Sequence, residues 1–233
     1  MHRRTLVAAS LTLPLSLVPG RARAAPSASS VLELFTSQGC SSCPPADALL
    51  GELTRQPGVI GLAWHVDYWN SSAWRDPYAK REWTDRQKAY ARYLSGEVFT
   101  PALVVNGTAL TVGSDAPAVR RVMAQLPPPP LAVALRRAAD GGGLEAEIGA
   151  TTTPVGAMLV TYDPARTTQV NGGENLGSRL MEYRVVQTAI PVERLAARFT
   201  LPPVPEGRGA VLLVQDANWR VMGAADLPPS AAR

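Results

Sequence analysis

Two cysteines, three residues apart, stand between an apolar run and a segment that opens with two prolines. Cys40 and Cys43 are the only cysteines among 233 residues. A structural disulfide in an oxidising compartment usually closes a long loop, because a long loop restricts the unfolded chain most. Closing so short a ring stabilises a fold very little. The pair is therefore better explained by reactivity than by cross-linking.

The residues around this pair alternate between strand and helix patterns. The run Val31–Phe35 is short and apolar, which is typical of a buried strand. Pro44 and Pro45 suit the first turn of a helix, and the leucines that follow give that helix an apolar face. An Asn-Gly pair at 106–107 indicates a hairpin. The patterns predict strands over 31–35, 59–66, 101–105 and 108–112, and helices that begin near 44 and span 78–94 and 115–126.

The composition changes after four consecutive prolines at 127–130, which predict a stiff extended spacer. Beyond them there is no long amphipathic helix, and turn residues separate several short β-prone runs. We therefore expect a small antiparallel β-sandwich that packs on the first domain. The predicted domains are 25–126 and 131–233, and the strand-like runs are 131–135, 144–148, 157–162, 184–188 and 210–214.

Residues 1–24 have the pattern of a signal peptide. A positive start is followed by an interrupted apolar run and by the small-residue pattern Ala22-Arg23-Ala24. The run is too short to span a bilayer as a helix, and an uncleaved anchor is the alternative interpretation. Arg3-Arg4 leaves open whether export uses the Sec or the twin-arginine route. We expect an exported protein, periplasmic or secreted.

Charge argues against two classes of partner. The signal holds four of the 23 Lys and Arg and none of the 19 Asp and Glu, so the two signs balance in the rest of the chain. Without a dense basic cluster there is no electrostatic basis for nucleic-acid binding. There is equally no polybasic surface for a membrane, and no later segment is long and apolar enough to span one.

A Cys-x-x-Cys that follows a strand and opens a helix indicates thiol chemistry. Free N–H groups and the helix dipole favour a thiolate on Cys40, the more exposed sulfur in such motifs. Cys43, one turn inside, would then attack a mixed disulfide. We interpret Cys40 as the attacking thiol and Cys43 as the resolving thiol. The alternatives are an inert disulfide and a copper or zinc site made by Cys40, Cys43 and His65.

The order of elements, with the cysteines between the first strand and the first helix, resembles the thioredoxin fold. In that fold a cis-proline precedes the strand that faces the Cys-x-x-Cys loop, and Thr100-Pro101 stands at the corresponding place. The resemblance implies that Thr100 and Pro101 offer backbone groups to an extended substrate. A trans-proline at a strand start is the alternative. Trp69 lies in a Trp- and Tyr-rich stretch that could line a substrate groove or belong to the core.

Segments 34–47, 64–69 and 99–101, with the later stretches 172–179 and 183–186, resemble a family of secreted bacterial proteins known only as domain of unknown function 1223. The likeness extends over nearly the whole mature chain. It implies an α+β fold with an α/β core, in which a thioredoxin-like domain is followed by a β-rich accessory domain. It implies no established reaction.

The chain departs from ordinary thioredoxins at a buried acid that helps to move protons during exchange. At that position, six residues before the first cysteine, this chain has Leu34. Glu33, Asp47 or His65 could take its place. His65 and Asp67 end the second predicted strand two residues apart, so both should project from one face and could approach the cysteines.

A Gly-rich loop in the second half carries several polar side chains. It is either a ligand or partner site or a solvated loop. The polar residues are Asn171, Glu174, Asn175 and Arg179.

These features together predict an exported thiol–disulfide oxidoreductase. It would act on protein thiols or disulfides, need no cofactor and work with a redox partner protein. The alternative is a module on the same scaffold that binds copper, zinc or a protein without redox turnover.

Overall fold

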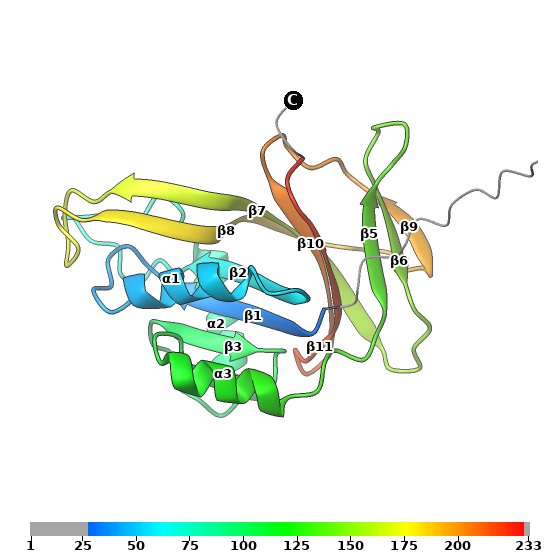
Figure 1. The fold of residues 1–233 in the computed structure, drawn as a ribbon, viewed down its shortest axis with the longest axis horizontal. Coiled ribbons are helices and arrows are strands. Elements are labelled where there is room, and N and C mark those ends of the chain that lie inside the picture. The colour runs from blue at the N-terminus through cyan, green and yellow to red at the C-terminus, as the bar shows by residue number, and fades with distance from the viewer. Residues whose placement is uncertain (1–27, 231–233) are drawn as a thin grey trace, which may run out of the picture.

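The computed structural model describes residues 28–230, which form one large sheet, one small sheet and three helices (Figure 1). The predicted signal peptide, residues 1–24, lies outside the described residues. In chain order the elements are β1 (Ser30–Thr36), α1 (Pro44–Leu53), β2 (Val59–His65), α2 (Arg81–Tyr93), β3 (Ala102–Val105), β4 (Ala109–Val112), α3 (Ala116–Gln125), β5 (Val133–Arg137), β6 (Leu144–Ile148), β7 (Val155–Gln169), β8 (Arg179–Pro191), β9 (Arg198–Leu201), β10 (Gly209–Asp216) and β11 (Val221–Leu227).

The large sheet has eight strands in the order β11-β10-β7-β8-β2-β1-β3-β4. β2 runs parallel to both β1 and β8, and every other neighbouring pair is antiparallel. α1 supplies the crossover connection that the parallel pair β1 and β2 requires. The protein is therefore a mixed α/β structure with a large, mostly antiparallel sheet.

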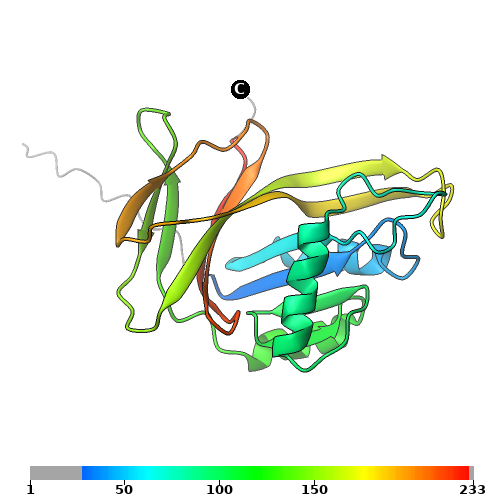
Figure 2. The ribbon, with the colours of Figure 1, turned by 180° about the vertical axis from the view of Figure 1, so that it is seen from behind.

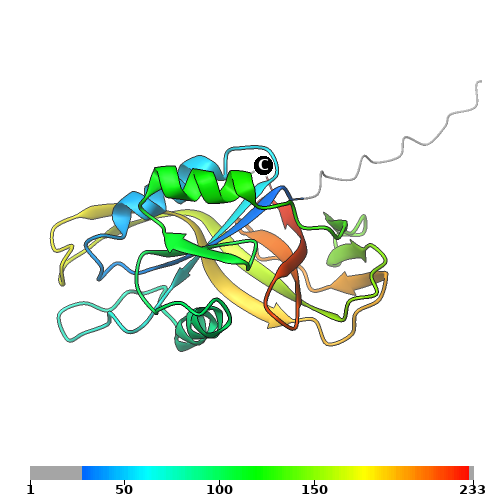
Figure 3. The ribbon, with the colours of Figure 1, turned by 90° about the horizontal axis from the view of Figure 1, so that it is seen from below.

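Helices cover both faces of the sheet around β1 and β2 (Figure 3). α1 and α3 lie on one face, where the leucines of α1 pack with Leu32 and Leu34 of β1. α2 lies on the opposite face, where Trp83 and Tyr90 pack in the same core as Phe35. Alternate residues of a strand point to opposite faces, so β1 is buried on both sides. The loop that follows β1 is thus anchored by two packed layers.

The second half of the chain extends the large sheet and also forms a layer of its own (Figure 2). β5, β6 and β9 make a three-stranded antiparallel sheet that packs on β7, β10 and β11 around a second apolar core. These layers correspond to the two sheets of the expected sandwich, but one layer is continuous with the sheet of the first half. The continuity comes from β8, which lies beside β2 and pairs with it at Ala63 and Val185.

Where the elements differ from the sequence-based prediction, the causes are local. The helix expected over 78–94 begins at Arg81, because Lys80 is still extended and bridges to Val66. β7 and β8 are longer than the predicted runs, since the outer part of β7 is mostly exposed and has no buried-strand pattern. β9 and β11 have no counterpart among the predicted strands. Within residues 28–230, no helix has the length and apolar character needed to cross a membrane.

Candidate functional site

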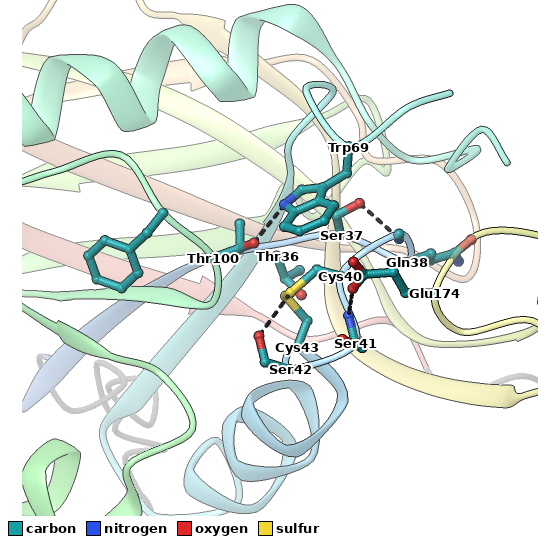
Figure 4. The surroundings of a disulfide bond; sticks show 12 residues. Thr36, Ser37, Gln38, Cys40, Ser41, Ser42, Cys43, Trp69, Thr100 and Glu174 are labelled. Atoms are coloured by element: carbon teal, nitrogen blue, oxygen red, sulfur yellow. Dashed lines mark hydrogen bonds between the residues drawn. A yellow bond between two sulfur atoms is a disulfide. The ribbon is translucent and has the colours of Figure 1, made fainter. Parts of the chain in front are cut away.

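The two cysteines form a disulfide at the junction of β1 and α1 (Figure 4). Their Cα atoms are 5.4 Å apart, and Cys43 directly precedes the first residue of α1. Cys40 is only 1% exposed and Cys43 is 0% exposed. The expectation that Cys40 is an exposed sulfur is therefore wrong for this disulfide form. The main chain beside Cys40 is held by a segment from the second half of the chain.

That segment is the hairpin of residues 170–178, which connects β7 to β8 and which we name the cover hairpin. Glu174 Oε2 accepts a hydrogen bond of 3.0 Å from the N–H of Ser41. The side-chain amide of Asn175 donates to the carbonyl oxygens of Gln38 and Cys40, each at 3.0 Å. Figure 4 shows Glu174 against the disulfide loop, beside Ser41. The cover hairpin thus holds the main chain on both sides of Cys40.

The other two polar residues of the Gly-rich loop take no part in this contact. Asn171 and Arg179 are exposed. The sequence identified the loop as a candidate site, and of its four polar residues the central pair, Glu174 and Asn175, reaches the disulfide loop, at Ser41 and at Cys40.

Trp69 joins the disulfide loop to the Thr100-Pro101 segment. Its Nε1 donates a hydrogen bond of 2.7 Å to Thr100 Oγ1. Its Cβ and carbonyl oxygen lie so close to Gly39 that a side chain at Gly39 would be crowded. The Thr100-Pro101 peptide bond is cis, as predicted, and Pro101 directly precedes β3. The structure therefore brings Trp69 and Thr100, the residue before Pro101, together beside the disulfide loop (Figure 4).

Behind the loop lie four buried ionisable side chains: Asp47, His65, Asp76 and Glu182. His65 Nδ1 is 2.7 Å from Asp76 Oδ2, and His65 Nε2 is 3.9 Å from Glu182 Oε1. Burial disfavours the imidazolium, but the surrounding carboxylates outweigh it and raise the pKa of His65 to about 9. Burial raises the pKa of Glu182. Burial acts on Asp76 too, yet His65 overcomes it and lowers the pKa of Asp76. At neutral pH the cluster thus contains a charged His65–Asp76 pair.

Gln38 connects this cluster to the disulfide loop. Its backbone N–H donates to Asp76 Oδ2 at 2.9 Å, and its side-chain amide donates to Glu182 Oε2 at 2.9 Å. Its carbonyl oxygen accepts the hydrogen bond from Asn175. The loop, the buried cluster and the cover hairpin therefore form one hydrogen-bonded unit.

Asp47 is the member of the cluster nearest to Cys43 along the chain. It follows Cys43 by one helical turn, which puts the two side chains on one face of α1. Asp47 Oδ2 accepts a hydrogen bond of 3.2 Å from Thr36 Oγ1, while Oδ1 is buried with no partner among residues 28–230. Burial raises the pKa of Asp47 to about 7, against the opposing charge of His65. Asp47 can therefore take up or release a proton near neutral pH.

Two other candidate residues lie away from the cysteines. Glu33 points to the α2 face of β1, where it accepts hydrogen bonds from Arg86 at 2.6 and 3.0 Å. Asp67 accepts a hydrogen bond of 2.5 Å from Thr84 Oγ1 in α2. The expectation that His65 and Asp67 project from one face toward the cysteines is wrong for Asp67. β2 ends at His65, so the two-residue alternation of the strand does not continue to Asp67.

Within residues 28–230, no group of three or more His, Cys, Asp or Glu side chains is arranged to hold a metal ion. Both ring nitrogens of His65 face carboxylates, those of Asp76 and Glu182. A copper or zinc site made by Cys40, Cys43 and His65 would need thiolates, hence an open disulfide. That site remains a prediction.

Sequence reasoning missed three residues of this site: Gln38, Asp76 and Glu182. All three are buried, yet a single acid or amide side chain in a sequence is ordinarily predicted to lie at the surface. Their partners are distant along the chain, as shown by Gln38 and Glu182, which are 144 positions apart. The sequence holds no local signal that could have paired them.

Comparisons with known proteins give a family and a fold. Residues 31–215 match a family described as a protein of unknown function, DUF1223. The crystal structure of an Agrobacterium tumefaciens protein, a structural genomics target, is similar at a TM-score of 0.77 with 28% identity, covering 89% of this chain and 97% of that one. HBP35 of Porphyromonas gingivalis is similar in fold, at a TM-score of 0.58 with 15% identity over 88% of this chain and 77% of that one. No curated protein matches the chain.

Proposed function

The chain belongs to the DUF1223 family, and from that premise we propose that it is an exported thiol–disulfide oxidoreductase acting on proteins. The observation that carries the proposal is the Cys40–Cys43 disulfide at the N-terminus of α1. So short a ring adds little stability, whereas free N–H groups at a helix N-terminus favour a thiolate. The arrangement of β1, α1 and β2, followed by α2, the β3–β4 hairpin and α3, supports a thioredoxin-like first domain.

In the oxidising direction, a substrate thiolate attacks the Cys40 sulfur. The bond to Cys43 breaks, a mixed disulfide joins Cys40 to the substrate, and Cys43 leaves as a thiolate that takes a proton. A second substrate thiolate then attacks the substrate sulfur of the mixed disulfide and releases Cys40. The substrate loses two electrons and two protons, and both cysteines become thiols. A redox partner protein with a disulfide of its own restores the starting state, and the reversed steps reduce a substrate disulfide.

We assign Asp47 as the acid that exchanges a proton with Cys43 during these steps. It is buried one turn after Cys43, and its Oδ1 has no other partner among the described residues. Its pKa of about 7 supports the role, since proton transfer is most efficient when the pKa of the group is near the working pH.

The Asp47→Asn protein is expected to exchange disulfides about 100-fold more slowly than the wild type. An amide cannot take the proton from Cys43, so the pH-dependent step near 7 should also disappear from its rate profile. Stopped-flow rates of reaction with a peptide dithiol between pH 5 and 9 measure both effects. A rate profile that keeps the same step would show that another group transfers the proton.

The same change should alter stability with a defined sign. The pKa of Asp47 rises from 3.8 to about 7 on folding, so the folded state holds the proton more tightly. This contribution to stability is present below about pH 4 and is lost as the pH rises to about 7. Relative to the wild type, Asp47→Asn should therefore gain about 4 kcal/mol between pH 4 and pH 8. Urea unfolding of both proteins at pH 4 and pH 8 measures this gain. The same difference in stability at both pH values would contradict the raised pKa of Asp47.

We propose that an extended substrate segment binds beside the disulfide at Thr100, Pro101 and Trp69. Trp69 and Thr100 are partly exposed and hydrogen-bonded to each other, which fixes the indole next to the loop. The proposed site of action is the periplasm or the exterior of a bacterium, where protein thiols are oxidised and disulfides persist.

The proposed function is tested with residues 25–233 in two assays. In one, the oxidised protein is mixed with a peptide that carries two thiols, and the peptide disulfide is followed by mass spectrometry. In the other, insulin reduction is followed by turbidity with dithiothreitol as the electron donor. We expect catalysis in at least one assay and none from the Cys40→Ser/Cys43→Ser double variant.

Inactivity in both assays would overturn the proposal. Tight, stoichiometric copper or zinc uptake that the double variant loses would then favour the metal-binding module.

A further inference from the structure

We propose that the cover hairpin, residues 170–178, is a movable cover that has to lift before the Cys40–Cys43 disulfide can react with a protein substrate. This inference rests on the proposed function, because it concerns access to the same site. It is carried by the combination of a buried disulfide with a hairpin that is hydrogen-bonded to the disulfide loop on both sides of Cys40.

The disulfide is hidden although part of its own loop faces solvent. Ser41 and Ser42, between the cysteines, are exposed, whereas Cys40 is 1% exposed. Disulfide exchange requires a thiolate to reach one of the two sulfur atoms. A protein substrate cannot reach Cys40 until a covering group moves. Cys43 lies at the start of α1, which packs into the core, so uncovering Cys43 would require the helix to move.

The cover hairpin is attached to the loop by polar contacts that water can replace. Glu174 accepts one hydrogen bond from the N–H of Ser41, and Asn175 donates to two loop carbonyls. Leu176, next to them, is 67% exposed and buries little surface against the loop. Such hydrogen bonds contribute modestly to stability, because water satisfies both partners when they separate. Val170 at the base of the hairpin is buried and Gly172 lies against Ala73, so the part that can lift with little cost is the tip that carries Glu174 and Asn175.

The cover hairpin is also closed on itself, which lets it move as a body. The N–H of Val170 donates to the carbonyl of Ser178, and the N–H of Gly177 donates to the carbonyl of Val170. Gly173 and Gly177 have φ of +70° and +84°, values that favour glycine. Figure 1 shows the hairpin at the end of β7 and β8 that is remote from the three-stranded sheet. It is thus carried on two long strands and fixed at its tip by the loop contacts.

The closed cover opposes ionisation of Cys40 as well as access to it. Accepting the Ser41 N–H lowers the pKa of Glu174, so this side chain is ionised at neutral pH. The carboxylate therefore places a negative charge on the residue that follows Cys40, which opposes a second negative charge on the Cys40 sulfur. Lifting the hairpin removes the negative charge in the same movement that uncovers the sulfur.

The test compares the Asn175→Asp and Asn171→Asp variants of residues 25–233. Asn175→Asp replaces the amide that donates to two carbonyls with a carboxylate that they repel, which favours the open cover. Asn171→Asp makes the same chemical change at an exposed position of the same hairpin. The readout is the rate at which dithiothreitol reduces the Cys40–Cys43 disulfide. It is measured by alkylating the new thiols and determining the protein mass by mass spectrometry. We expect Asn175→Asp to be reduced at least about tenfold faster than the wild type, and Asn171→Asp at the wild-type rate.

A second variant, Glu174→Gln, provides the test if Asn175→Asp does not fold. Glu174 is exposed, and Glu174→Gln keeps its shape but removes the charge from its hydrogen bond, so reduction should be about threefold faster. If every folded variant were reduced at the wild-type rate, the proposal that the hairpin covers the disulfide would be overturned. It would also be overturned if the wild-type protein were reduced as fast as an exposed peptide disulfide. The reductant requires no enzymatic activity. An inactive protein whose variants are reduced faster therefore contradicts only the proposed function, and an active protein without these rate differences contradicts only the cover.

Discussion

A covalent complex between Cys40 and a substrate protein is expected to accumulate in the Cys43→Ser protein, while turnover falls to the uncatalysed rate. In the proposed reaction, the Cys40 thiolate attacks a substrate disulfide, the second substrate sulfur leaves as a thiolate, and a mixed disulfide forms. In the wild type, Cys43 then attacks Cys40 and breaks that bond. A serine hydroxyl is not a nucleophile at neutral pH, so the complex persists. Non-reducing electrophoresis after incubation with insulin detects it, and dithiothreitol should release it.

Cys40→Ser is the matched control. Cys43 is buried as Cys40 is, but it directly precedes α1, which packs into the core, so uncovering its sulfur would require that helix to move. We expect no complex from this variant. Equal amounts of complex from both single variants would contradict the assignment of Cys40 as the attacking thiol.

Replacing Arg86 with methionine should lower the free energy of unfolding by about 3–5 kcal/mol. Arg86 Nε and Nη2 donate to the two carboxylate oxygens of Glu33, and the side chains are only 6% and 1% exposed. Methionine fills part of the space but leaves the Glu33 carboxylate buried without a countercharge, which is the source of the cost. The guanidinium also lies over the rings of Trp64, Tyr90 and Trp219. Urea denaturation at pH 7 measures the loss.

Two further variants separate this cause from others. In Glu33→Gln/Arg86→Met the buried charge is gone, so much of the lost stability should return. Arg81→Met breaks an exposed ion pair with Asp85 on the same helix, and it should cost less than about 1 kcal/mol. An effect of Arg86→Met as small as that of Arg81→Met would show that the buried pair does not stabilise the fold.

Signals that act over a few residues predicted most of the first half. The apolar run Val31–Phe35, the prolines of α1 and the Asn-Gly pair at 106–107 each specify their own neighbourhood, and β1, α1 and the β3–β4 hairpin lie where these signals put them. Asp115, at the start of the predicted helix over 115–126, caps α3, since its side chain accepts a hydrogen bond from the N–H of Ala118. The same local reasoning placed the cysteines between strand and helix.

Contacts between distant segments could not be predicted in this way. β8 lies beside β2 through the pair Ala63 and Val185, and neither strand carries a pattern that specifies its partner. Glu174 reaches Ser41 across 133 positions. The motif alone suggested an exposed sulfur, because it carries no information on such long-range contacts or on the burial of Cys40. A pattern in one sequence carries information on residues that are close along the chain. The buried ionisable cluster and the cover hairpin are instead formed by residues that only the tertiary fold brings together.

The pairing of β8 with β2 limits how such a protein can be recombined. β8 occupies one edge of β2, and Gln215 of β10 accepts a hydrogen bond from Arg86 of α2. A crossover at the prolines 127–130 would separate both pairs of partners and leave an open strand edge, which promotes pairing with foreign chains. The half that contains the cysteines therefore cannot be transferred to another protein by itself, and recombination has to keep both halves together.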